Sequence, residues 1–285
     1  MTIPDTVVTF LAEAHLGDIT NVILLAGGHI NRASRITTSA NLSFILKENA
    51  IDRLFECEAA GLEALRQAGI NTPKVFAVGA HFLLMEDLGH HPLDEPDWEA
   101  FGRAVAHLHR HTHDRFGYDY DNYLGPLAQI NTWSDDGHEF FGQNRVLRYL
   151  AEPKCEQALT PQDRQNLERL VKRLSDLIPT QPPVLVHGDL WHTNMLLDAR
   201  RQPTLIDPAV YYGWAEADLS MTRQYGDGKV PPRFFDAYIE VNPLPAGWWD
   251  RLELLMIRQQ MAVLAFFGNE YNTLDQLRAT LAKFG

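Results

Sequence analysis

The chain has 285 residues, of which 45% are hydrophobic and 22% are charged, and its formal net charge is −12. This length exceeds the roughly 100–150 residues of a common domain, so we expect two lobes or one large domain. An acidic chain without a basic cluster is unsuited to nucleic acid and to anionic membrane surfaces, because both require Lys or Arg against phosphate.

The sequence has no pattern that indicates export or membrane insertion. The segment M-T-I-P-D-T-V-V-T-F lacks basic residues, and the apolar runs fall short of the roughly 18–20 residues of a membrane span. The two cysteines, Cys57 and Cys155, have neither metal-binding nor redox spacing. These features predict a soluble, cytoplasmic protein without a disulfide scaffold, and we expect a monomer or a weak dimer.

The N-terminal part of the chain has mainly strand-like patterns. After a short helix that ends at Gly17, apolar and β-branched residues form five short runs, and a segment with apolar residues at helical spacing, 54–65, separates the third from the fourth. The pattern predicts an antiparallel five-stranded sheet with a helix. The five runs are residues 22–25, 35–37, 43–47, 75–78 and 82–85.

Two adjacent glycines, Gly27 and Gly28, follow the first strand. Because they lack Cβ atoms, their backbone can approach phosphate groups closely, as the glycine-rich flap over a nucleotide does. An ordinary hairpin turn explains the same pair, since neither the full kinase glycine motif nor a P-loop lysine is present.

Lys47 ends an apolar strand, and two acidic residues, Glu56 and Glu58, follow it in the helical segment. A strand lysine paired with a helix glutamate holds the α- and β-phosphates of ATP in kinases. A surface lysine beside a solvated helix is the alternative interpretation.

From residue 87 onward the patterns are mostly helical. Asp94 and Pro96 begin a helix that ends in several histidines, of which His107 and His111 share a face. These two could hold a metal ion, but histidines at a helix C-terminus also complement the helix dipole, and no third ligand joins them. Further helices are expected at 160–178, 233–240, 247–267 and 273–283.

The run 116–137 is rich in Gly, Asp, Asn and Tyr. Because this composition is too polar for a core, we expect a functional loop over a cleft. Asn131 and Trp133 are candidate contacts to an acceptor substrate, although a Trp in such a loop is commonly a packing anchor.

The most informative stretch runs from residue 184 to residue 218. The β-branched run 184–186 predicts a strand that leads into His187-Gly188-Asp189, and the runs 195–197 and 204–206 predict a hairpin. Asp189, Asn194 and Asp207 should therefore lie on loops or at strand edges. Taken singly, each could be an ordinary turn former.

Together these three residues suit phosphoryl transfer. One carboxylate must orient and deprotonate the attacking hydroxyl, and hard oxygen ligands must bind Mg²⁺ at the nucleotide phosphates. Asp189 suits the first role, and Asn194 and Asp207 suit the second, because their order and spacing follow the protein-kinase arrangement. Asp218 begins a helix and can accept hydrogen bonds from the catalytic-loop backbone, while His187 would orient that loop.

The chain resembles the fructosamine kinase (ketosamine-3-kinase) family, within the aminoglycoside phosphotransferase and protein-kinase-like superfamily. The H-G-D motif with its Asn is common to the superfamily, whereas the D-L-W extension and the D-P-A-V-Y-Y-G run are much more specific to the family. The chain departs from the family pattern beside the site, at 192–193 and 214–215. The matching segments are G-G-H-I-N-R-A at 27–33, H-G-D-L-W-H-T-N at 187–194, I-D-P-A-V-Y-Y-G at 206–213 and E-A-D-L at 216–219.

The resemblance implies an α+β, protein-kinase-like fold of two lobes with ATP between them. Residues 1–86 would form the β-rich nucleotide-binding lobe, and residues 87–285 the mostly helical catalytic and acceptor-binding lobe. It also implies that Glu58, rather than Glu56, is the partner of Lys47. Backbone groups at the hinge would bond adenine, and these belong to Glu86 and Leu88.

The reaction that the resemblance implies is phosphorylation of the 3-hydroxyl of a ketosamine by ATP and Mg²⁺. The ketosamine would be ribulosamine or fructosamine on a small amine or a protein lysine, and loss of the sugar from the unstable product would reverse glycation. Trp191 would offer a flat apolar face to the sugar, or else form a wall of the core.

Two alternatives remain open in the sequence. The acceptor could be an aminoglycoside, choline or another small alcohol, or the protein could be a non-catalytic nucleotide-binding regulator. The presence of Lys47, Asp189, Asn194 and Asp207 together disfavours the regulator.

Overall fold

The computed structural model describes residues 3–25, 30–89, 91–224 and 229–285. It divides into two compact units, Met1–Pro92 with Leu196–Asp207, and Leu93–Met195 with Pro208–Gly285. Each unit is described by itself below. Among the helices of the described ranges, none is long and apolar enough to cross a membrane.

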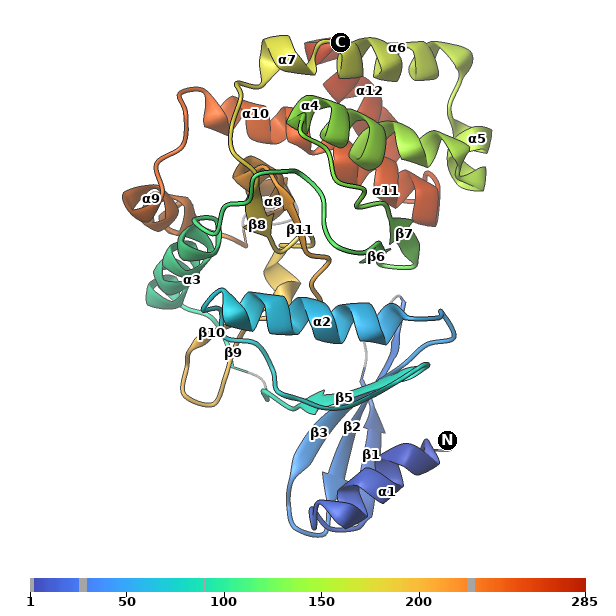
Figure 1. Cartoon of the computed structure of the whole chain (residues 1–285), viewed down its shortest axis with the longest axis vertical. Coiled ribbons are helices and arrows are strands. Elements are labelled where there is room, and N and C mark those ends of the chain that lie inside the picture. The colour runs from blue at the N-terminus through green and yellow to red at the C-terminus, as the bar shows by residue number, and fades with distance from the viewer. Residues whose placement is uncertain (1–2, 26–29, 90, 225–228) are drawn as a thin grey trace. The chain divides into compact units, whose positions relative to one another are not determined.

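The first unit contains a five-stranded antiparallel sheet, whose strands lie in the order β1-β2-β3-β5-β4 (Figure 1). Side chains alternate across it, so Phe44 and Leu46 of β3 pack with Val7 and Leu11 of helix α1 in one apolar cluster. The sheet predicted from the sequence is thus confirmed. The strands are β1 (Ile19–Leu24), β2 (Arg32–Thr38), β3 (Ser43–Glu48), β4 (Val75–Gly79) and β5 (Phe82–Glu86), and α1 spans Asp5–Glu13.

Helix α2 (Leu54–Gln67) crosses between β3 and β4 in the chain and contacts β4 and β5. Its buried side, which includes Phe55, Glu58 and Leu62, has the predicted helical spacing. The hairpin of β9 (Met195–Leu197) and β10 (Pro203–Leu205) is bonded to the segment between α2 and β4, because Asn71 Nδ2 donates to Thr204 Oγ1 at 2.6 Å.

The second unit is built of helices around a short two-stranded sheet of β8 (Val184–Val186) and β11 (Tyr211–Gly213) (Figure 1). The two strands are antiparallel, and both contribute side chains to the main apolar core. Helix α3 (Glu95–Leu108) packs along α9 (Pro232–Val241).

The remaining helices of this unit surround the same core. The helix predicted at 247–267 is two helices that meet at Met256, and the helical segments between 137 and 158 had no counterpart in the sequence prediction. The helices are α4 (Gly137–Phe140), a π-helix (Phe141–Val146), a 3₁₀ helix (Leu147–Ala151), α5 (Pro153–Ala158), α6 (Pro161–Lys172), α7 (Leu174–Leu177), a second 3₁₀ helix (His192–Asn194), α8 (Ala215–Gln224), α10 (Trp248–Leu255), α11 (Ile257–Phe267) and α12 (Thr273–Phe284).

The segment 116–137 is not too polar for the core, contrary to the prediction from its composition. It contains a hairpin of β6 (Asn122–Leu124) and β7 (Leu127–Gln129), and Asn122, Gln129 and Asn131 are almost completely buried. Burial is possible because their amides bond one another and the backbone. Asn131 Nδ2 donates to Asn122 Oδ1 at 3.0 Å, Asn122 Nδ2 to the Val210 oxygen at 2.8 Å, and Gln129 Nε2 to the Ala209 oxygen at 3.0 Å.

Candidate active site

The H-G-D segment follows directly from β8 in the second unit. Gly188 has a φ of +83°, in the left-handed region, and a Cβ atom there would lie 2.0 Å from the carbonyl oxygen of Ala209. Only glycine fits this turn without movement of the backbone. The close approach keeps Asp189, which is half-buried, at a fixed place after the strand.

Asp218, in helix α8, accepts hydrogen bonds from the backbone of this loop. Its carboxylate accepts hydrogen bonds from the backbone N–H groups of His187 at 2.6 Å and Gly188 at 2.8 Å. Burial would raise the pKa of Asp218, but bonds from the His109 side chain and the loop backbone outweigh burial and lower it. The contact expected between Asp218 and the loop backbone is present.

His109 is the residue of this arrangement that sequence reasoning missed. Its Nε2 lies 3.2 Å from Asp218 Oδ2, and its Nδ1 lies 2.9 Å from the hydroxyl of Tyr238. The neighbouring His107 and His111 are exposed, and no cluster of three or more His, Cys, Asp or Glu side chains suited to a metal ion occurs in the described residues. The available signal for His109 was its place directly after α3, four residues beyond the apolar Val105.

Asn194 fixes the side chain of Asp189 within the second unit. Its Nδ2 donates to the Asp189 backbone oxygen at 2.9 Å and to Asp189 Oδ2 at 3.1 Å. Since both contacts use the NH₂ group, the Oδ1 atom is the part of Asn194 that suits a cation. His187 supports the same residue, because its Nδ1 accepts a hydrogen bond from the Asp189 N–H at 3.2 Å.

In the first unit, Lys47 joins two carboxylates. Lys47 Nζ lies 2.6 Å from Glu58 Oε1 and also bonds Asp207, so the partner of Lys47 is Glu58, whereas Glu56 faces Arg53. Burial disfavours the charged ammonium, but Asp207 and Glu58 outweigh burial and raise the pKa of Lys47. Burial raises the pKa of Glu58, and Lys47 only partly offsets this.

Asp207 has a φ of 55°, a left-handed conformation that costs a residue other than glycine about 1–2 kcal/mol. Its side chain is 39% exposed, whereas those of Lys47 and Glu58 are 7% and 9% exposed. Strained backbone of this kind is concentrated at functional sites. Asp207 therefore presents a partly open carboxylate beside an almost buried pair.

The remaining residues predicted to belong to the site are Gly27, Gly28, Glu86, Leu88 and Trp191. Gly27 and Gly28 lie outside the described residues. The backbone N–H of Glu86 donates to the Lys74 oxygen at 2.8 Å, so this N–H is already engaged, and Leu88 is buried. Trp191 is half-buried, with its ring edge-to-face against His192.

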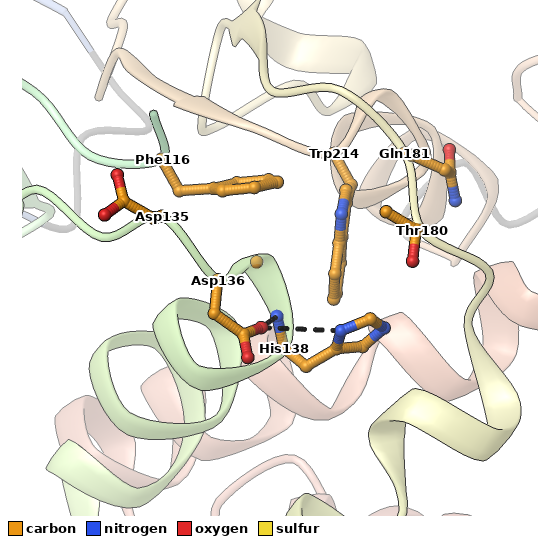
Figure 2. A pocket seen from close by; sticks show the side chains of 8 residues that line it. Phe116, Asp135, Asp136, His138, Thr180, Gln181 and Trp214 are labelled. Carbon is orange, nitrogen blue, oxygen red and sulfur yellow. Dashed lines mark hydrogen bonds and ion pairs between the residues drawn. The ribbon is translucent and has the colours of Figure 1, made fainter. Parts of the chain in front are cut away.

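A separate cavity of about 260 Å³ lies in the second unit, and Figure 2 shows its lining. The rings of Phe116, Trp214 and His138 meet edge to face there. Thr180 precedes β8 and Trp214 follows β11, so this cavity lies at the opposite end of the strand pair from Asp189. None of the predicted site residues lines it. The lining residues are Phe116, Asp135, Asp136, Gly137, His138, Thr180, Gln181 and Trp214.

Comparison with known proteins agrees with this arrangement. The family model described as fructosamine kinase matches residues 5–283, almost the whole chain. The chain belongs to the fructosamine kinase family. Membership makes the protein a phosphotransferase of the ketosamine kinase class that uses ATP.

Relatives within the fructosamine kinase family cover nearly the full length. A probable ketoamine kinase of Enterococcus faecium is 33% identical over 264 residues, which is 90% of this chain and 93% of that protein. The chloroplastic protein-ribulosamine 3-kinase of Arabidopsis thaliana is 31% identical over 277 residues, covering 92% and 82%.

A crystal structure of a fructosamine-3-kinase homologue from Thermobifida fusca superposes with a TM-score of 0.86. Its sequence is 31% identical, and the match covers 98% of this chain and 99% of that one. The α+β, kinase-like fold predicted from the sequence, with its antiparallel five-stranded sheet and helical remainder, is confirmed.

Proposed function

We propose that this protein transfers the γ-phosphoryl group of ATP to the 3-hydroxyl of a ketosamine, ribulosamine or fructosamine, on an amine. The observation that carries the proposal is the geometry of Asp189. Its carboxylate is positioned by Asn194, and its backbone is positioned by a loop that Asp218 holds through two N–H groups. A positioned carboxylate is what abstraction of a hydroxyl proton requires.

In this proposal Asp189 is the general base. It orients the acceptor hydroxyl and takes its proton as the oxygen attacks phosphorus. Asp218 and His187 are positioning residues, because they touch the loop and not the reacting atoms. A carboxylate acts as a general base only when it is placed within hydrogen-bond reach of the hydroxyl.

The donor set also suits Mg²⁺, which prefers hard oxygen ligands. Asn194 offers Oδ1, since its NH₂ group is used on Asp189, and Asp207 offers a carboxylate that is partly open. We propose these two residues as the metal ligands. When bound, the ion would offset the negative charge of the phosphate groups.

We assign nucleotide binding to residues 1–86 and catalysis with acceptor binding to residues 87–285. Lys47 would contact the α- and β-phosphates while Glu58 holds its ammonium in place. Gly27 and Gly28 would cover the phosphates, and backbone groups of the segment from Glu86 to Leu88 would bond adenine.

The relative from Arabidopsis is named for ribulosamine on proteins, and this supports a ketosamine acceptor here. The half-buried ring of Trp191, two residues after the proposed base, would pack against the sugar carbons. Phosphorylation at O3 creates a leaving group on the carbon next to the ketosamine carbonyl. The product would lose a C3–O bond to release inorganic phosphate, and water would then cleave the C1–N bond, so that the sugar leaves as a 3-deoxy dicarbonyl compound and the amine is restored.

The test is an assay of ADP release with purified protein, Mg²⁺ and ATP. The acceptors are ribulosyl- and fructosyl-lysine, an aminoglycoside and choline, with phosphorus NMR of each product. We expect turnover on the ketosamines with the phosphate on O3. Turnover confined to an aminoglycoside or choline, or ATP binding without any turnover, would contradict the proposal.

A further inference from the structure

Four aromatic side chains form a continuous group on the second unit, here called the aromatic ladder: His113, Tyr118, Trp133 and Tyr212. The His113 and Trp133 rings stack with centroids 4.5 Å apart and planes at 19°. Tyr212 lies 4.7 Å from His113 and 6.1 Å from Trp133, and Tyr118 lies 6.1 Å from Tyr212. Stacked rings of this kind form a preorganised contact surface.

The ladder remains partly open to solvent. His113 is exposed, and Tyr118, Trp133 and Tyr212 are half-buried, whereas the adjacent Tyr211 is 1% exposed in the core. Strand β11 therefore presents one tyrosine to the interior and the next to the surface, as side-chain alternation in a strand requires. Large aromatic rings at the surface are more common in binding sites than elsewhere.

The rim of the ladder is acidic. Asp114 and Asp119 are exposed next to it in sequence, and no salt bridge within the described ranges engages either. Burial raises the pKa of the Tyr212 hydroxyl, and the negative charge of Asp119 raises it further. The Asp119 carboxylate therefore interacts electrostatically with Tyr212. Asp135 is also exposed, but Arg115 bonds it at 2.8 Å. Ring faces with uncompensated carboxylates favour cations.

The position of the ladder relative to Asp189 follows from the strand register. Tyr212 is paired with Leu185, and Asp189 follows Leu185 by four residues. At the rise of an extended strand, Leu185 and Asp189 are at most about 13 Å apart, and the roughly 5 Å between paired strands puts the Tyr212 Cα within about 18 Å of the Asp189 Cα. In a ketosamine on lysine, nine bonds separate the 3-hydroxyl oxygen from the lysine Cα, which is on the order of 11 Å when extended.

We propose that the aromatic ladder is a subsite for a basic stretch of polypeptide beside the modified lysine. The inference rests on the proposed ketosamine kinase activity and deepens it, because it assigns the acceptor as a protein or peptide with Lys or Arg flanks. Arginine and lysine side chains would lie over the faces of Trp133 and Tyr212, and Asp114 and Asp119 would add charge attraction.

The experiment compares three acceptors with the intact protein. One is ribulosyl-lysine blocked at its amino and carboxyl groups, and the others are ribulosylated peptides with Arg or with Glu on both sides of the lysine. For the native protein, kcat/KM should be about tenfold higher with Arg flanks than with Glu flanks, as two exposed cation–π contacts allow. The preference should shrink as salt is raised from about 0.01 to 0.3 M.

The variants are Trp133→Ala, Tyr212→Ala and Asp119→Asn, with Tyr271→Ala as the control. Tyr271 is also an exposed aromatic of the second unit, at 52%, but it lies outside the ladder. Each ladder variant should lower the Arg-to-Glu ratio toward one, mainly through KM, and the control should keep the native ratio. Because the ratio is taken on one preparation, partial unfolding cancels from it.

The outcomes separate the two proposals. If none of the three acceptors is phosphorylated, the ketosamine kinase proposal itself fails. If all are phosphorylated but the native ratio is near one, or the ladder variants keep the native ratio while lowering every rate alike, the ladder is a packing feature and the subsite is refuted.

Discussion

The Asp218 carboxylate and the His109 imidazole lie 3.2 Å apart in the interior of the second unit, where both side chains are almost fully buried. In Asp218→Asn, an NH₂ group replaces one carboxylate oxygen. This NH₂ group is a hydrogen-bond donor, and it would face a backbone N–H of the loop, which is also a donor. We expect the free energy of unfolding to fall by about 1–3 kcal/mol, as for a buried polar group that loses its partner. Urea denaturation measures this.

The same variant should also lower kcat, since the loop that carries Asp189 loses a hydrogen bond. His109→Leu is the companion change, because it removes a partner of Asp218 but leaves both loop contacts in place. It should reduce stability with a smaller effect on turnover. Equal effects of both variants on kcat would show that the loop does not depend on these two N–H bonds.

Asp189→Asn removes the proposed base and keeps the size of the side chain. We expect kcat to fall by about 10²- to 10⁴-fold, the usual contribution of a general base, while ATP binding measured by calorimetry persists. Asp236→Asn, at an exposed position of α9, is the control and should keep native turnover. Near-native kcat in the first variant would remove Asp189 from this role.

Lys47→Met leaves Glu58 buried without its cation. Breaking a buried pair in this way costs about 3–5 kcal/mol, so unfolding should occur at much lower denaturant concentration. The double variant Lys47→Met with Glu58→Leu should recover most of that stability, because the buried charges are then both removed and the other partner of Lys47, Asp207, is partly exposed to solvent. It should not recover activity if Lys47 contacts phosphate, and recovered turnover would make the pair purely structural.

Gly188→Ala and Gly69→Ala form a matched pair, because both glycines have a φ of +83°. A Cβ atom at Gly69 meets nothing within 4 Å, so that variant should lose only the about 1–2 kcal/mol of the left-handed conformation. At Gly188 the added atom collides with the Ala209 oxygen. We expect a larger loss of stability and a loss of turnover there, and similar effects of the two substitutions would argue against a rigid loop.

Asp163 and Arg278 give a pH-dependent contribution to stability. The bidentate contact with Arg278, at 3.0 and 2.9 Å, lowers the pKa of Asp163 to about 2 from an ordinary 3.8. Since the native pKa is the lower one, the ionised carboxylate stabilises the fold above pH 3.8, and this contribution is lost as pH falls toward 2.

Asp163 also bonds Thr160 at the start of α6, so Asp163→Asn should cost about 1 kcal/mol at neutral pH. Thermal unfolding of native and variant protein from pH 7 to pH 2 measures the difference, which should close below pH 3. A difference that stays constant over this range would mean that ionisation of Asp163 plays no part.

Local patterns predicted the sheet and the turn that follows β8. Strand alternation in β3 and helical spacing in α2 act over a few residues, and the H-G-D motif carries its turn requirement in Gly188. The pairing of Lys47 with Glu58 could not be derived from spacing, because Glu56 fits equally and only the packing of α2 decides which carboxylate faces the sheet.

Contacts between distant segments explain the errors. The polar composition of 116–137 predicted that this segment lies outside the core. Asn122 and Gln129 are nevertheless buried, because the backbone oxygens of Val210 and Ala209, some 80 to 90 positions away, accept their hydrogen bonds. His109 was hidden for the same reason, since its partners Asp218 and Tyr238 come from later helices. No single-sequence pattern reports such long-range partners.

The amides of Asn122, Gln129 and Asn131 have a consequence of their own. The amides of Asn122 and Gln129 join the β6–β7 hairpin to the backbone of Val210 and Ala209, and the amide of Asn131 donates to Asn122, all through groups that carry no charge and do not titrate. Acid and concentrated salt weaken the ion pair between Asp163 and Arg278, but they leave the hydrogen bonds of these amides intact. Inactivation at low pH should therefore begin elsewhere, with the hairpin still attached to the Ala209–Val210 backbone.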